Sequence, residues 1–78
     1  MALEDELKAI IVEQLAVDEA AVVPNARLQD DLGADSLMLM ALAELLAARY
    51  KISIEPDEVF DVPDVAGLVE LVRSKLPA

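Results

Sequence analysis

The sequence predicts an all-α protein, a small four-helix bundle in which three longer helices and one short third helix surround an aliphatic core. Apolar residues make up 56% of the 78 residues, and nearly all are Ala, Leu, Val, Ile and Met, which together favour helices over strands. Segments with helical spacing alternate with stretches that contain Pro, Asn and Gly. So short a chain has room for one core, and we expect residues 1–78 to form a single domain.

The first helix is expected in the N-terminal segment. Glu4, Asp5 and Glu6 lie in its first turn, where the helix dipole favours negative charge. Its apolar residues recur at helical spacing, so we expect an amphipathic helix that buries them. They are Leu3, Leu7, Ile10, Ile11 and Leu15.

A long ordered loop is predicted between the first two helices. Residues 17–35 lose the helical periodicity and contain Pro24, Asn25 and Gly33. A loop of this length in a small protein is more often functional than idle. Its apolar residues are expected to pin it to the core, and these are Val22, Val23, Leu28 and Leu32.

The second helix is predicted to begin near Ser36, with Asp35 as its N-cap. Arg49 and Lys51 lie near its end, where positive charge suits the dipole. One stripe of this helix is expected to face the core. It consists of Leu39, Leu42, Ala43, Leu46 and Tyr50.

Two further helices are predicted in the rest of the chain. Pro56 suits the first turn of a short third helix that runs to about Phe60 or Asp61. Residues 51–54 are an alternative strand, although no pairing partner is evident. Asp64 is expected to cap the last helix. The core stripe of that helix is Val65, Leu68, Val69, Val72 and Leu76.

The charge balance narrows the range of partners. Sixteen acidic and six basic residues give a formal net charge of −10, which nucleic-acid phosphates and anionic membrane surfaces would repel. We therefore expect no nucleic-acid partner and no membrane partner, and instead proteins with basic patches. A purely solubilising role for the charge is the alternative. The acidic start is unlike a secretory signal and no apolar run reaches membrane-spanning length, so a cytoplasmic location is expected.

The chain lacks the residues for autonomous catalysis. It contains no Cys and no His, which excludes thiolate metal ligands and a Ser–His–acid triad. The stretch GADSL also lacks the second glycine of a nucleophile elbow. Calcium loops starting at Asp30 or Asp61 would have apolar residues at ligand positions. We therefore expect neither an enzyme nor a metal site.

Ser36 is either a residue that starts a helix or a substrate for modification. A serine after aspartate at a helix start commonly acts only as a cap. Here Asp35 can already cap the helix, which leaves the Ser36 hydroxyl available. The positive end of the helix would also favour an attached phosphate. The physical chemistry of these residues permits a modification site without requiring one.

Residues 31–37, DLGADSL, resemble the phosphopantetheine attachment site of acyl carrier proteins. The resemblance covers essentially the whole chain. VPNARLQDDLG precedes and overlaps the site, YKISIEPDE follows the second helix, and VPDV leads into the last helix. The chain is therefore identified as a member of this family, which implies a helical bundle of the acyl-carrier type.

The resemblance implies a cofactor and its place of attachment. A separate magnesium-dependent phosphopantetheinyl transferase is expected to move 4′-phosphopantetheine from coenzyme A to the Ser36 hydroxyl. The thiol at the end of the arm then holds an acyl group as a thioester. Asp35 and Leu37 match the flanking motif residues. Asp35 is expected to cap the helix and to help place the metal in the transferase complex, and Leu37 to contact partners.

The second helix departs from the pattern of fatty-acid-synthesis carriers, which usually have an acid directly after the DSL motif and another three residues later. Met38 and Ala41 occupy these positions, and Glu44 is the only acid between Ser36 and Tyr50. An exposed apolar stripe is therefore expected, of the kind that marks a contact surface. The alternative is that the preceding loop covers part of it. The predicted partner-binding residues are Leu37, Met38, Met40, Ala41, Glu44, Asp57 and Glu58.

This departure favours a discrete carrier for polyketide or other specialised acyl biosynthesis. The carrier is expected to be a monomer. Its expected partners are acyltransferase, ketosynthase or acyl-ligase enzymes with basic and apolar docking patches. The alternatives are a housekeeping fatty-acid-synthesis carrier, then an aminoacyl or peptidyl carrier, then an unmodified acidic adaptor. Peptidyl carriers commonly have GGxSL where this chain has GADSL. An adaptor would accept no phosphopantetheine and would tolerate Ser36→Ala.

Overall fold

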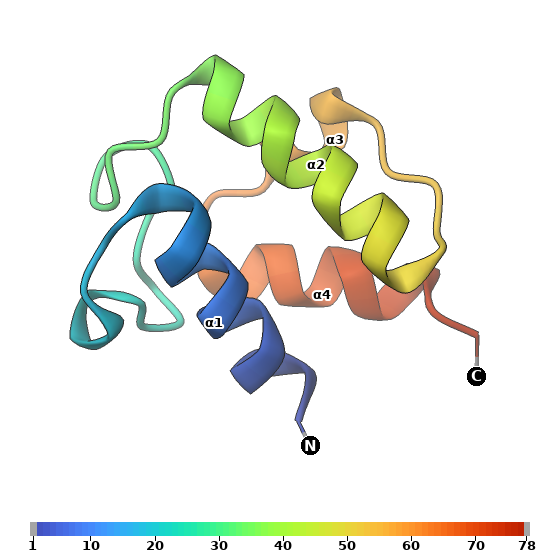
Figure 1. Cartoon of the computed structure of the whole chain (residues 1–78), viewed down its shortest axis with the longest axis horizontal. Helices are drawn as coiled ribbons and strands as arrows, with labels where there is room; N and C mark the ends of the chain where they lie inside the picture. Colours follow the sequence, from blue (N-terminus) through green and yellow to red (C-terminus); the bar gives the residue numbers. More distant parts are fainter. Residues whose placement is uncertain (1, 78) are drawn as a thin grey trace.

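In a computed structural model, which describes residues 2–77, the chain forms four α-helices and one short 3₁₀ turn (Figure 1). The elements are α1 (Leu3–Leu15), the 3₁₀ turn η1 (Glu19–Ala21), α2 (Ser36–Tyr50), α3 (Pro56–Asp61) and α4 (Val65–Lys75). The described residues include no strand, so the strand alternative for segment 51–54 is wrong. Lys51 is the left-handed C-cap of α2, and residues 52–54 link it to α3. The predicted all-α class, with three longer helices and a short third one, is confirmed.

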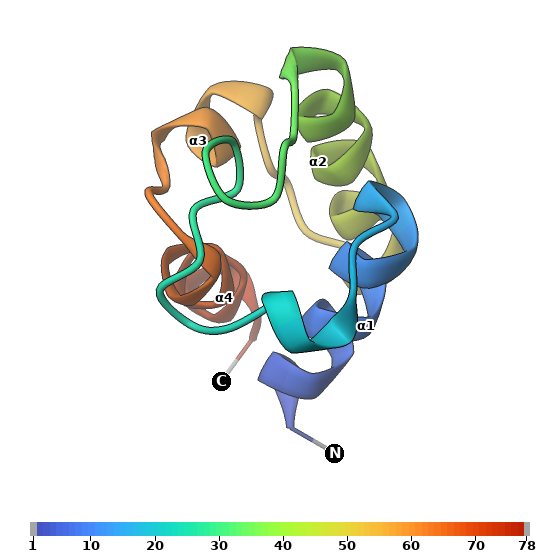
Figure 2. The ribbon, with the colours of Figure 1, turned by 90° about the vertical axis from the view of Figure 1, so that its left-hand side faces the viewer.

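The helices pack their apolar stripes into one hydrophobic cluster. α1 packs against both α2 and α4, and α3 packs against α2 on the side away from α1 (Figures 1 and 2). Within residues 2–77, no helix combines the length and the apolar character needed to cross a membrane. The core stripes of the longer helices lie where the sequence predicts them. Their buried members are Leu7, Ile10, Ile11, Leu15, Leu39, Leu42, Ala43, Leu46, Val65, Leu68, Val69 and Val72.

Three members of the predicted stripes lie at the margin of the core. Leu3 and Leu76 are half-buried, and Leu76 follows the last residue of α4. Tyr50 is also half-buried, because its hydroxyl reaches out to donate a hydrogen bond of 2.8 Å to the Glu6 carboxylate. Partial burial and the neighbouring Glu6 raise the pKa of Tyr50 above its ordinary value. Tyr50 therefore joins the end of α2 to α1 through a polar contact.

The loop between α1 and α2 is ordered, but its contacts differ in part from the prediction. Figure 2 shows it passing first α4 and then α3 before it reaches α2. Val22, Leu28 and Leu32 are buried as expected, whereas the Val23 side chain is 42% exposed, so its predicted role as a pin is wrong. Ala26 is buried instead. The Val23 carbonyl accepts from the Ala26 N–H (3.0 Å), and this tight turn directs the small alanine inward and the valine outward.

Candidate functional site

The segment before Ser36 is shaped to present the start of α2. Leu32 and Ala34 are buried and anchor the segment, and the Ala34 N–H donates to the Leu28 carbonyl at 2.9 Å. Gly33 lies between them with a φ of 72°, in the left-handed region that other residues enter only at a cost. The motif DLGAD is thus an anchored turn that delivers the chain to the first residue of α2.

Asp35 is the N-cap of α2, as predicted. Its Oδ1 accepts from the Met38 N–H at 2.9 Å, and its carbonyl accepts from the Leu39 N–H at 3.0 Å. Within residues 2–77, the N–H groups of Ser36 and Leu37 have no acceptor and the Ser36 hydroxyl makes no hydrogen bond. The Ser36 side chain is exposed. The cap is therefore complete without Ser36, which leaves an unengaged hydroxyl beside two unpaired amide donors.

The outward side of α2 carries the predicted apolar surface. Leu37 is 75% exposed, Met38 36% and Met40 42%, and Ala41 is also exposed. Glu44 is the only acidic residue of α2 and is exposed on the same side. The preceding loop does not cover these residues, so the alternative of a masked stripe is wrong.

The two predicted partner contacts on α3 differ in their surroundings. Asp57 is exposed and makes no ion pair within residues 2–77. Glu58 instead accepts from the Glu55 N–H at 3.0 Å and pairs with the Lys75 ammonium at 2.9 Å. The backbone N–H first and then Lys75 hold the pKa of Glu58 below its ordinary value. The Glu58 carboxylate therefore stabilises α3 and its contact with α4, whereas the Asp57 carboxylate is free.

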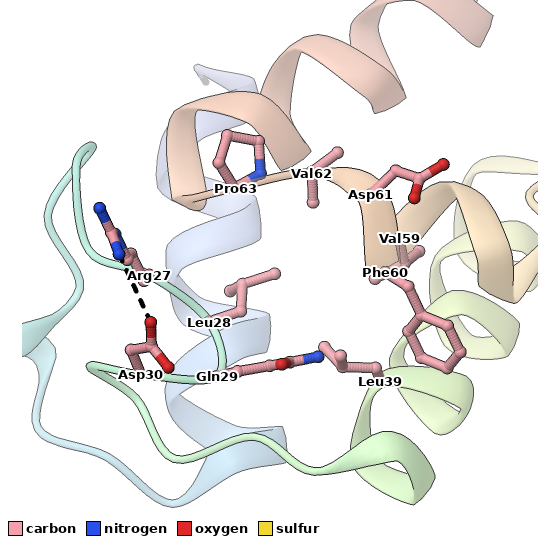
Figure 3. Close-up of a pocket in the computed structure, with 10 residues that line it drawn as sticks. All are labelled: Arg27, Leu28, Gln29, Asp30, Leu39, Val59, Phe60, Asp61, Val62 and Pro63. Atoms are coloured by element: carbon pink, nitrogen blue, oxygen red, sulfur yellow. Dashed lines mark hydrogen bonds and ion pairs between the residues drawn. The ribbon is translucent and has the colours of Figure 1, made fainter.

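A cleft of about 280 Å³ opens between the loop before α2 and the end of α3 (Figure 3). Arg27 and Asp30 form an ion pair on its rim at 3.5 Å. Phe60 lies at its other side, near Leu39. Phe60 is not among the site residues that the sequence predicts. A signal was nevertheless present, because Phe60 is the only Phe of the chain and lies in a short acidic helix beside Asp57 and Asp61.

Comparison with known proteins identifies the class that this fold and site define. The family model for a phosphopantetheine attachment site matches residues 5–72. An acyl carrier protein of Helicobacter pylori is 38% identical over 73 residues, which cover 94% of each chain. An acyl carrier protein of Solidesulfovibrio magneticus is 35% identical over 75 residues, or 96% of each chain. The chain therefore belongs to the acyl carrier protein family. It is a carrier and not an enzyme.

The prosthetic group of this family is 4′-phosphopantetheine, attached to a serine. The start of α2 fits such a group, because an exposed hydroxyl stands beside unpaired N–H groups at the positive end of a 15-residue helix. A carrier of this kind must meet a phosphopantetheinyl transferase and acyl-handling enzymes. No group of three or more acidic side chains within residues 2–77 is arranged to hold a metal ion.

Proposed function

We propose that this chain is a discrete acyl carrier for polyketide or other specialised acyl biosynthesis, with its phosphopantetheine arm on Ser36. The observation that carries the assignment of Ser36 is that the helix cap at the start of α2 is made by Asp35 and not by Ser36. Asp35 alone caps the helix, so the serine is exposed and unengaged. A serine that served only as a cap would use its own oxygen to accept from the first-turn amides.

The surroundings of the other two serines support the same assignment. The chain contains Ser36, Ser53 and Ser74. Ser74 donates its hydroxyl proton to the Leu71 carbonyl at 2.7 Å within α4. Ser53 is exposed but lies in the extended link, two residues before the N-cap Glu55 of α3, and is not the first residue of a helix. Ser36 alone among the three combines exposure, an unengaged hydroxyl and neighbouring amide donors.

The residues around Ser36 hold and orient the group without performing chemistry. When bound, the arm supplies the thiol that carries an acyl group as a thioester. The N–H groups of Ser36 and Leu37 point out of the helix start and favour a negatively charged phosphodiester there. The Ser36 hydroxyl has no acceptor within residues 2–77, so we expect the transferase to accept the proton that leaves it. Asp35 keeps the helix start fixed through its bond to Met38.

Intact-mass measurement tests the attachment site. The apo chain is incubated with coenzyme A, magnesium and a broad-specificity phosphopantetheinyl transferase, beside Ser36→Ala and Ser53→Ala. Wild type and Ser53→Ala are expected to gain one phosphopantetheinyl unit, and Ser36→Ala none. Modification of Ser36→Ala would contradict the assignment. No gain by a folded, initially unmodified wild type would favour the unmodified adaptor.

The proposed pathway rests on the outward face of α2. Met38 and Ala41 are exposed at the two positions where acids are typical of fatty-acid-synthesis carriers, so this face offers hydrocarbon in place of charge. A partner that recognises carriers through carboxylates on the second helix would contact only one on α2, that of Glu44. Docking by apolar contact therefore suits enzymes with a less basic binding face.

Restoring the acids tests the pathway. The holo chain and its Met38→Glu/Ala41→Glu variant are titrated against a ketosynthase of fatty-acid synthesis. The control, Ala20→Glu/Val23→Glu, has the same net charge but adds its acids to exposed loop positions. We expect only the first variant to bind about tenfold more tightly than wild type, an effect that salt weakens. Wild type that already binds as tightly as this variant would favour the housekeeping fatty-acid carrier.

A further inference from the structure

The exposed side of α3 presents one aromatic ring between two free carboxylates. Phe60 is 37% exposed, although its neighbour Val59 is buried. Asp57 lies three residues before Phe60, on the same side of the helix, and Asp61 follows it directly. Both aspartates are exposed, and neither makes an ion pair or a side-chain hydrogen bond within the described part of the chain. Glu58, by contrast, is engaged by Lys75.

This side of α3 lies next to the edge of α2 that carries Ser36. Leu45 and Arg49 line the groove between α2 and α1, so they mark one edge of α2. Helical geometry places Met40 on the opposite edge of α2, with Ser36 one turn before it. α3 packs against α2 on the side away from α1, which is the side of this edge (Figure 1). Phe60 lines the same cleft as Leu39, the residue before Met40 (Figure 3). The ring therefore extends the apolar surface of α2 across to α3, on the side where Ser36 begins the helix.

An enzyme that acts on Ser36 must cover more than the serine. A specific protein interface buries about 800 Å² of each partner, an area that extends well past one helix start. Apolar contacts supply affinity there, but charges set the orientation of docking. α2 offers one carboxylate for this purpose, Glu44, whereas α3 offers Asp57 and Asp61 on either side of an aromatic ring. Aromatic residues, Phe among them, are enriched in protein interfaces relative to the rest of the surface.

We propose that Phe60 is the anchor by which the phosphopantetheinyl transferase recognises this carrier. The proposal rests on the attachment of the arm to Ser36. An apolar or arginine side chain of the transferase packs on the Phe60 ring, and its basic residues pair with Asp57 and Asp61. Charge complementarity selects this occupant, because a chain of net charge −10 that presents two unpaired carboxylates beside an exposed ring matches a basic, partly apolar docking face.

Steady-state kinetics of arm transfer test the proposal. The full apo chain is modified by a broad-specificity transferase, and the product is counted by intact mass. Phe60→Ala is expected to lower kcat/KM about tenfold, mainly through KM, because the ring contributes to docking and not to the chemical step. Val23→Ala, which shortens an equally exposed apolar side chain in the loop, is expected to leave kcat/KM unchanged.

The carboxylates give a test that does not depend on the packing of Phe60. Asp57→Asn/Asp61→Asn is expected to lower kcat/KM and to weaken its dependence on salt, whereas Asp18→Asn, at an exposed acid of the loop, is expected to do neither. Equal kcat/KM for wild type, Phe60→Ala and the double variant would overturn the role of α3 while Ser36 remained the attachment site. A wild type that accepts no arm at all would instead overturn the proposed function.

Discussion

The starts of α2 and α4 use the same capping device and leave the helix end in opposite states. Asp35 Oδ1 accepts from the Met38 N–H at 2.9 Å, and Asp64 Oδ1 accepts from the Gly67 N–H at 2.8 Å. The residue after each cap differs, because Ser36 is exposed whereas Val65 is 6% exposed. The same aspartate signal therefore begins one helix at the surface and another against the core.

The backbone around α4 explains this difference. The Val65 N–H donates to the Ala26 carbonyl at 3.0 Å, and the Ala66 N–H donates to the Pro24 carbonyl at 2.8 Å, so the loop consumes the free amides of α4. The corresponding amides of α2, those of Ser36 and Leu37, have no acceptor within residues 2–77. One helix end is thus used to fix the loop, and the other remains available for an anion.

Val65→Ser tests the difference between the two helix starts with the largest expected effect, because it gives α4 the same Asp-Ser start as α2. It removes buried apolar surface and places a hydroxyl in the core, so we expect a loss of about 2 kcal/mol in the free energy of unfolding. We also expect the folded variant to accept only one phosphopantetheinyl unit. Urea unfolding and intact mass measure the two effects.

The matched control for this variant is Ala66→Ser, which adds a hydroxyl at the next, exposed position of α4. It is expected to change stability by less than about 0.5 kcal/mol. Addition of a second phosphopantetheinyl unit to the folded Val65→Ser protein would mean that burial of the helix start is not what separates the two ends.

Removing the cap of α4 or of α2 gives a second, smaller difference in stability between the two helix starts. Asp64 is half-buried, and Gly67 packs closely on it, since a Cβ on Gly67 would lie 3.3 Å from Asp64 Oδ1 and 3.1 Å from Pro63 Cδ. We expect Asp64→Ala to cost about 1–2 kcal/mol and Asp35→Ala, at an exposed cap, about 0.5 kcal/mol. Urea unfolding followed by circular dichroism compares the two, and equal losses would contradict the difference in burial.

The sequence predicts what depends on local pattern and misses what depends on the path of the loop. Both aspartate caps and the core stripes follow from residue type and helical spacing. The prediction that Val23 packs on the core is wrong. Outside a helix, the sequence has no regular spacing that indicates which side chains point inward. The loop carbonyls that accept hydrogen bonds from the first N–H groups of α4 lie about forty residues before it in sequence. These hydrogen bonds therefore cannot be predicted from local sequence.

In the candidate site, too, the sequence predicts the residues of a local motif but not those that depend on distant contacts. The DLGADSL motif indicates Ser36, Asp35 and Leu37 without a structure. The engagement of Glu58 by Lys75 and the proximity of Phe60 to α2 become visible only when α3 is placed between its neighbours. Residues of a short helix that meet distant segments are thus the part of this site that sequence reasoning reaches least well.

α3 begins with a third arrangement and gives the smallest expected effect, which depends on pH. Glu58 accepts from the Glu55 N–H and pairs with Lys75, and these contacts lower its pKa from the ordinary value of 4.5. A carboxyl whose pKa is lower in the folded chain stabilises the fold above about pH 4.5, and this contribution is lost as the pH falls through the folded pKa. Glu58→Gln is therefore expected to melt slightly below wild type at pH 7 and together with it in strong acid.

Asp57→Asn is the matched control for this pH dependence, because it neutralises the neighbouring carboxylate, which makes no ion pair within residues 2–77. It is expected to leave the melting temperature at pH 7 unchanged or slightly raised, since it removes one of many mutually repelling acids. Thermal melts of the three proteins at a series of pH values make the comparison. A difference in melting temperature between wild type and Glu58→Gln that stays constant down to strong acid would show that Glu58 acts through packing. The charge of its carboxylate would then not stabilise the start of α3, just as the hydroxyl of Ser36 does not cap α2.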